Sequence, residues 1–243
     1  MSKLKFKRIS VVFKRDYNEF IKWKSYNILL LLFGILIILA ILMTNFLLPN
    51  MTWMNVQNDD HIYQMITFHI LLLLAMAPLI ISIPLFTSGP FTREKANGVI
   101  SALLSTQLRQ EEIWLGKSFA VFVPTFTISF VSSLIATYAV SKLITIPGEL
   151  LFTIFLITPL MYLGLTVFTV QLSMILSSEL SIAPSYLVGM LLLIGIPVGS
   201  LTGYLDISSW KFSLLCALLT VFTWILVWFY SIYLTKERII LSK

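Results

Sequence analysis

Six long apolar runs determine what this chain can fold into. Each is about 20 residues or longer, the length that an α-helix needs to cross a hydrocarbon core of roughly 30 Å. Lipid offers no partner to backbone N–H and C=O groups, so only helices and closed barrels span membranes, and the alternating pattern of barrel strands is absent. The sequence therefore predicts an all-α integral membrane protein with six transmembrane helices, at roughly Tyr26–Leu48, Tyr63–Leu85, Ser118–Val140, Leu150–Leu176, Ile182–Gly203 and Phe212–Leu234.

Composition supports one membrane domain over residues 1–243. Charged residues make up 12% of the chain and hydrophobic residues 58%, whereas soluble domains carry roughly 25% charged residues. Fifteen of the 17 Lys and Arg residues precede the first run, lie between the second and third runs, or follow the last run. Basic loops stay in the cytoplasm, so we expect both termini to be cytoplasmic and the protein to be a multi-pass protein of the plasma membrane. The sequence has no basic patch interleaved with accessible aromatic residues, so we do not expect nucleic-acid binding.

The segment before the first run, residues 6–24, is amphipathic. Its apolar residues fall on one helical stripe, with Lys and Arg on the other faces, which is typical of a helix lying in the membrane interface. The alternative is a basic segment that only sets the topology. The stripe, which favours the interfacial helix, consists of Phe6, Ile9, Val12, Phe13, Tyr17, Phe20 and Trp23.

The apolar runs offer little chemistry. None contains Asp, Glu, Lys or Arg in its body, although ion-driven carriers need intramembrane charge. His69 lies there alone, and we expect it to hydrogen-bond to a neighbouring helix. Cys216 is the only cysteine, so neither a disulfide within the chain nor a metal cluster is expected. The string Gly116-Lys117-Ser118 ends like a P-loop, but Glu111 stands where the first glycine belongs. We therefore expect no catalytic site, metal or cofactor in this chain, and energy supplied from outside it.

A polar segment, residues 93–117, separates the second and third runs. Its apolar residues recur at i, i+4 spacing, which predicts a short amphipathic helix, and Gly98 allows the chain to turn into it. A groove on a partner protein could accept those side chains. The alternative is a helix lying on the membrane surface. The ridges are Val99/Leu103 and Ile100/Leu104/Leu108.

The end of the fifth run has glycines at every fourth position, which is compatible with close helix packing. A proline among them equally allows a broken or re-entrant helix end. The residues are Gly195, Pro197, Gly199 and Gly203.

The polar segment carries a pattern of an acidic-basic pair, a glycine, a Leu-Leu-x-Thr step and a closing Glu-Ile…Gly-Lys. The residues are Glu94-Lys95, Gly98, Leu103-Leu104-Ser105-Thr106, Glu112-Ile113 and Gly116-Lys117. This pattern resembles the signature of ABC type-2 transporter permeases, from which the chain departs at Ala96, Val99, Ser101 and Gln107.

The resemblance assigns roles to these segments. It implies that Val99–Leu108 is a coupling helix that docks on a separate ATPase, that 6–24 is the elbow helix, and that the loop Ser177–Ser185, with Ser178 and Glu179, is a smaller second contact. It also favours a re-entrant reading of Gly195–Gly203. The ATPase-coupling set so implied is Glu94, Lys95, Gly98, Val99, Ile100, Leu103, Leu104, Thr106 and Leu108.

The function implied is that of the permease subunit of an ATP-driven exporter. It would pair with a second permease chain and with two ATPase subunits that hold ATP and Mg²⁺. An apolar, hydroxyl-rich path would suit an amphipathic cargo such as a peptide, lipid-linked molecule or drug. The alternatives are an ion-gradient-driven secondary carrier and a structural or sensory membrane protein.

Overall fold

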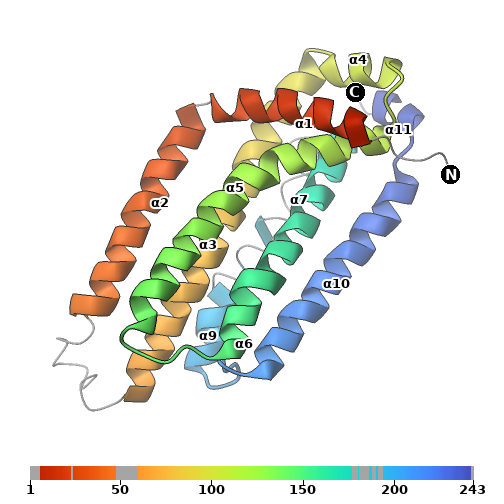
Figure 1. The fold of residues 1–243 in the computed structure, drawn as a ribbon. Coiled ribbons are helices and arrows are strands. Elements are labelled where there is room, and N and C mark those ends of the chain that lie inside the picture. The colour runs from red at the N-terminus through yellow and green to blue at the C-terminus, as the bar shows by residue number, and fades with distance from the viewer. Residues whose placement is uncertain are drawn as a thin grey trace.

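A computed structural model describes residues 6–22, 24–47, 60–176, 180, 186–187, 190 and 194–241. This part of the chain is helical (Figure 1), and its longest elements run side by side as a bundle. The elements are α1 Phe6–Ile21, α2 Lys24–Leu42, the π-helical segment η1 Met43–Leu47, α3 Asp60–Ala96, α4 Val99–Ser105, α5 Gln110–Ser141, α6 Gly148–Phe152, the π-helical segment η4 Thr153–Ile157, α7 Thr158–Ile175, α9 Ile196–Leu201, α10 Trp210–Tyr233 and α11 Lys236–Leu241.

Four stretches in the described residues are long and apolar enough to cross a membrane: Tyr63–Ile81, Gln110–Ser141, Gly148–Ile175 and Trp210–Tyr233. A fifth is reached if α1 and α2, which meet at an angle of 69°, count together as one broken span. Nine of the 22 residues of the predicted run Ile182–Gly203 lie outside the described residues, so the prediction of six spans stays a prediction.

The connection between the helices of the second and third runs is shorter than the polar segment 93–117. The helix of the second run continues to Ala96, and that of the third begins at Gln110. Polar residues extend both helices because their charges suit the helix ends: Glu111 and Glu112 lie in the first turn of α5, where the helix dipole favours acids. Both helices therefore continue past the apolar runs that were placed to end at Leu85 and to begin at Ser118, and only residues 97–109 lie between α3 and α5.

Helix α5 lies at the centre of the bundle. It packs against α1, α2, α3 and α7, while α7 also packs against α3 and α10. The largest cluster of buried apolar side chains among the described residues joins α3, α5, α7 and α10, with Leu71, Leu79, Leu150, Met161 and Tyr162 all at most 1% exposed. Burying one such side chain is worth roughly 1.5–3 kcal/mol in water, although in a bilayer tight packing rather than the hydrophobic effect holds helices together.

The amphipathic helix α1 lies across one end of α5 (Figure 1) and ends at Ile21 rather than at residue 24. Val12 and Phe20 of the expected stripe are buried, whereas Phe6 is 85% exposed. Gly116 of α5 allows the close approach: a Cβ at this position would lie 2.8 Å from Val12 Cβ and 3.1 Å from the Ile9 carbonyl oxygen. The apolar face of α1 is therefore seated on the chain's own α5.

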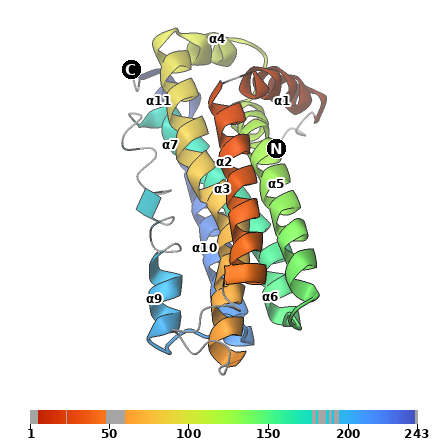
Figure 2. The same ribbon diagram turned by 90° about the vertical axis from the view of Figure 1, so that its left-hand side faces the viewer.

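At the opposite end of the bundle α9 is followed by a reversal of the chain (Figure 2). Gly203 makes the turn with φ of +76°, a left-handed conformation that favours glycine. Leu205 then folds back, because its N–H donates to the Gly199 carbonyl at 2.9 Å and a Cβ on Gly199 would lie 2.5 Å from Leu205 Cδ1. The close approach at Gly199 is thus to its own loop. Pro197 lies in the first turn of α9 and Gly195 just before it; a re-entrant path through the preceding residues remains a prediction.

We expect Gly116→Ala to lower the free energy of unfolding by about 1–3 kcal/mol, the usual result of overpacking a tight contact. The added methyl would meet the Val12 side chain and the Ile9 carbonyl, neither of which can rotate away as a flexible tip does. Thermal unfolding of the purified chain in detergent measures the change. Gly34→Ala is the matched control, since a Cβ at Gly34 of α2 meets nothing within 4 Å. Equal behaviour of the two variants would contradict the contact.

Candidate functional site

Helix α4 connects the two longest helices, α3 and α5, at the α1 end of the bundle (Figures 1 and 2). Gly98, with φ of +70°, makes the turn into it, as expected. The helix ends at Ser105 rather than Leu108, because Thr106 is extended and its hydroxyl donates to the Leu103 carbonyl at 2.6 Å. The Leu108 N–H then donates to the Thr106 hydroxyl, which fixes the turn toward α5.

One edge of α4 is buried within its own chain. Ile100 and Leu104 are 4% and 5% exposed, and Leu103 and Leu108 pack against the same cluster. The i, i+4 ridge was predicted correctly, but in this structure its side chains are buried in a cluster with residues of α5, α7, α10 and α11, where a partner cannot reach them. The remaining buried members of the cluster are Ile113, Trp114, Val167, Val170, Met174, Val227, Leu234 and Ile239.

The other edge of α4 and the turns that flank it are exposed. Ala102 and Ser105 project from the helix, Asn97 precedes it, and Thr106 and Gln107 follow it. These side chains are small or uncharged. They form a surface, here called the α4 face, that a partner can contact without unpacking the bundle.

Basic side chains hold the C-terminal end of α4. Arg8 of α1 donates to the Gln107 carbonyl oxygen at 2.7 Å, and Lys236 of α11 donates to the Leu104 carbonyl at 3.2 Å. The last carbonyls of a helix lack intrahelical partners and carry its negative dipole end, so cations are favoured there. Arg8 also lies 3.9 Å from the carboxylate of Glu112, which is buried and accepts a hydrogen bond from the Arg109 N–H at 3.1 Å. Segments from both ends of the sequence thus support α4.

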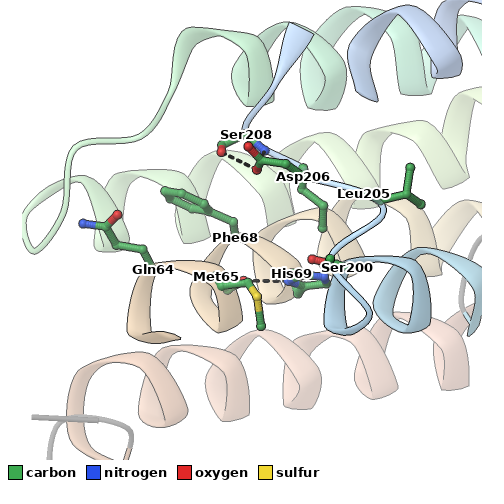
Figure 3. A pocket seen from close by; sticks show the side chains of 10 residues that line it. Gln64, Met65, Phe68, His69, Ser200, Leu205, Asp206 and Ser208 are labelled. Atoms are coloured by element: carbon green, nitrogen blue, oxygen red, sulfur yellow. Dashed lines mark hydrogen bonds between the residues drawn. The ribbon is translucent and has the colours of Figure 1, made fainter. Parts of the chain in front are cut away.

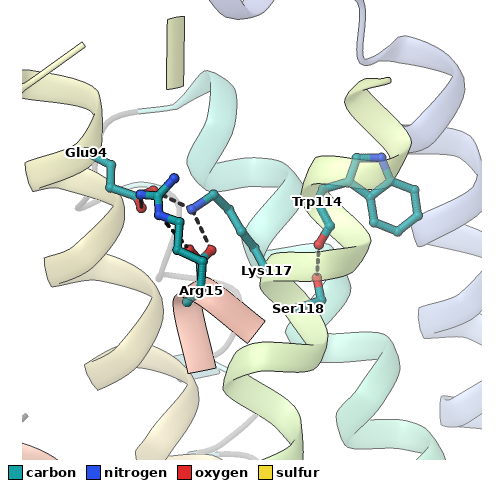
Figure 4. Close-up of polar contacts among 6 residues, drawn as sticks. Arg15, Glu94, Trp114, Lys117 and Ser118 are labelled. Carbon is teal, nitrogen blue, oxygen red and sulfur yellow. Dashed lines mark hydrogen bonds and ion pairs between the residues drawn. The ribbon is translucent and has the colours of Figure 1, made fainter. Parts of the chain in front are cut away.

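A cluster of four charges ties α1 to α3 and α5 (Figure 4). The ammonium of Lys117 in α5 lies 2.9 Å from an Asp16 oxygen of α1 and also binds Glu94 of α3. Arg15 of α1 approaches both acids, Glu94 at 3.3 Å and Asp16 at 3.6 Å. The Lys117 side chain is only 4% exposed and those of the two acids 14–15%. Such a cluster is neutral as a whole, but leaves a poorly solvated charge when one member is removed.

Lys95, the second half of the predicted Glu-Lys pair, serves another helix. Its ammonium donates to the carbonyls of Ile175 and Leu176, at 3.3 and 3.4 Å, where α7 ends. Burial removes water from the Lys95 ammonium and lowers its pKa from the ordinary value. The hydrogen bonds to the two carbonyls at the negative end of the α7 dipole partly replace that water. The adjacent residues Glu94 and Lys95 therefore fasten the end of α3 in two directions.

Sequence reasoning overlooked several members of this site. Asp16, Arg15 and the last helix, α11, were not selected, because their partners are distant in sequence. Lys117 was noted only as part of the family signature, after a P-loop was rejected, and its acidic partners were not predicted. Ser178 and Glu179, the predicted second contact, lie outside the described residues.

A cavity of about 280 Å³ lies at the opposite end of the bundle, lined by residues of α3, α9 and the following loop (Figure 3). His69 bonds the Met65 carbonyl of its own helix at 2.6 Å, so the expectation of a bond to a neighbouring helix was wrong. Asp206 accepts hydrogen bonds from the N–H and hydroxyl of Ser208, at 3.0 and 2.6 Å. Among the described residues no three His, Cys, Asp or Glu side chains gather as a possible metal site.

These features define a helical membrane protein whose longest membrane-crossing helices meet at a short helix outside the spans. The sequence model of the ABC-2 family transporter proteins matches residues 17–200, three quarters of the chain. The chain therefore belongs to the ABC-2 transporter family, as a membrane component, and this family's membrane domains are typically permeases without an ATPase site. No curated protein and no solved structure matches the chain.

We expect Lys117→Met to destabilise the protein by about 3 kcal/mol, the lower end of the effect of removing one partner of a buried ion pair. Asp16 and Glu94 would keep Arg15 but lose the ammonium between them. The triple variant Asp16→Asn/Glu94→Gln/Lys117→Met should recover most of the loss, because the one charge that remains, Arg15, is 43% exposed and stays solvated. Thermal unfolding in detergent compares the variants, and Lys142→Met, at an exposed position at the other end of α5, serves as the control. A triple variant weaker than Lys117→Met would contradict the account.

Proposed function

We propose that this chain is the permease subunit of an ATP-driven exporter, and that an ATPase subunit docks on the α4 face. A second permease chain completes the transport path, and ATP and Mg²⁺ bind to the ATPase subunits. Family membership supports the membrane role. The observation that carries the docking site is that α4 combines a buried apolar edge with an exposed, uncharged face.

The buried edge makes α4 suitable for transmitting force. Ile100 and Leu104 belong to a cluster that includes residues of α5 and α7. Short turns join α4 to α3 before it and to α5 after it. Close-packed interiors are hardly compressible and pass displacement on. Movement of a docked ATPase would thus displace several spans together instead of bending one loop.

The contact differs from the one that the sequence alone favoured. A partner groove that accepted the leucines would have to pull Leu104 out of the cluster. Docking on Ala102, Ser105 and their neighbours leaves the bundle packed, and small side chains let a partner surface come close to the α4 backbone. The Lys117 cluster and Arg8 keep α1 beside the same surface, so an ATPase on α4 would also lie near α1.

The cargo path follows less directly. The described buried hydroxyls of α5 and α7 mostly bond carbonyls of their own helices, as Thr125, Ser132 and Thr169 do. They therefore add little polarity to any path, and the proposal of an amphipathic cargo rests on the apolar surfaces alone. We place the protein in the plasma membrane, with the α4 end in the cytoplasm, because Lys and Arg gather at that end.

We expect Ala102→Arg to reduce the amount of ATPase subunit that copurifies with the chain by about tenfold or more, because a buried, unpaired charge in an interface weakens binding by several kcal/mol. Ala102 is exposed, so the variant should unfold at the same temperature as the parent. Pull-down in mild detergent from cells that produce both subunits measures the effect. Tyr204→Arg, at an 87% exposed position at the other end of the bundle, is the control. Undiminished copurification of the Ala102→Arg variant would overturn docking at this face.

A further inference from the structure

The last helix of the described chain, α11, is packed against the α4 end of the bundle. Residues 201–243, which include α10 and α11, follow the stretch that the family's sequence model matches. After α10 the chain breaks at Leu234, which is extended with ψ of 104°, and turns into α11. Helix α10, the last candidate span among the described residues, is thereby followed by a short segment that contacts α4.

Three contacts join this segment to α4 and to the start of α5. Ile239 is 4% exposed and Leu234 1%, and both lie in the cluster that contains Ile100 and Leu104. Lys236 donates to the Leu104 carbonyl at 3.2 Å, across 132 residues of sequence. In the reverse direction the side-chain amide of Gln110 in α5 donates to the Leu234 carbonyl.

The two hydrogen bonds are reciprocal in direction and the apolar contact lies between them. Each satisfies a carbonyl at a helix end, where intrahelical partners are missing: Leu104 in the last turn of α4 and Leu234 at the end of α10. An exposed lysine contributes little by itself, so we take the burial of Ile239 in the cluster that it shares with Ile100 and Leu104 as the main interaction, and Lys236 as the group that fixes its position. Helix α11 also packs against α7. Lys236 thus joins α11 to α4, and Gln110 joins the start of α5 to the end of α10.

We propose that α11 is a clasp that transmits displacement of α4 to α10, with Ile239 and Lys236 as positioning residues. The proposal rests on the proposed docking of an ATPase at the α4 face. It adds a second route, because α10 is otherwise packed mainly against α7 and the π-helical segment η4. Helix α10 would then move with the nucleotide state of the ATPase.

The first test uses the full chain in lipid nanodiscs without the ATPase. Ile239→Ala and Lys236→Met should raise amide hydrogen exchange of residues 99–105 by about tenfold, since local opening follows the loss of buried contacts. Arg238→Met removes the same charge as Lys236→Met two residues away. Among the described residues, Arg238 interacts with its own segment, at the Tyr233 ring and carbonyl, so this variant should leave exchange in α4 unchanged. Unaltered exchange in Ile239→Ala would overturn the clasp.

The second test measures transmission in the permease–ATPase complex. Lys211→Cys places a thiol on the exposed first turn of α10, at the far end from α11, while the native Cys216 is buried. Its labelling rate by a membrane-impermeant maleimide should change when ATP is added. That change should fall by about threefold or more in Ile239→Ala and Lys236→Met, and persist in Lys236→Arg and Arg238→Met.

The outcomes separate the two proposals. If no ATPase binds the parent chain, the proposed function fails, while hydrogen exchange still decides whether the clasp exists. If the ATPase binds but labelling at Lys211→Cys is the same with and without ATP, or changes equally in Ile239→Ala, transmission through α11 is overturned.

Discussion

The burial of the apolar edge of α4 is the constraint on which the rest of the arrangement depends. Ile100 and Leu104 are held within their own chain, and this burial decides which side chains of the segment remain available. If the edge were free, α4 would be a flexible loop on the bundle. Because the edge is packed, α4 stays in one position. Arg8 and Lys236 can therefore each donate to a single carbonyl oxygen, which a mobile segment would not keep in place.

Charge is distributed in a way that suits a membrane protein. The described apolar helices carry hydroxyls that bond carbonyls of their own turns, and only a few bonds cross between helices, such as Ser129 to the Ala75 carbonyl at 2.6 Å. The ionic contacts instead gather where helices leave the apolar region. Lys117 is 4% exposed, and its two acidic partners offset a charge that lipid would not tolerate. The ionic contacts therefore lie at the α4 end, while packed apolar side chains hold the spans together.

Much of this fold could be predicted from the sequence, since hydropathy and helical period are local properties. The apolar runs around α3, α5, α7 and α10 were found in the right places, as were the turn at Gly98 and the amphipathic character of α1. Helix ends were missed because polar residues such as Glu112 extend helices beyond the apolar runs. The partners of Lys117 and Leu104 could not be predicted, because a pairing across a hundred residues leaves no local pattern. The i, i+4 rule identified the edge of α4 that is buried, but not the molecule that buries it.

The seat of α1 has a consequence for how the chain is made. Asp16 and its partner Lys117 are 101 residues apart, and the close contact of Val12 depends on the missing side chain of Gly116. Synthesis proceeds from the N-terminus at roughly 5–20 residues per second, so α1 leaves the ribosome several seconds before the part of α5 on which it is seated. During that interval the amphipathic segment has only the lipid headgroups to shelter its apolar face. The same short helix therefore lies first on the membrane surface and afterwards packs on α5.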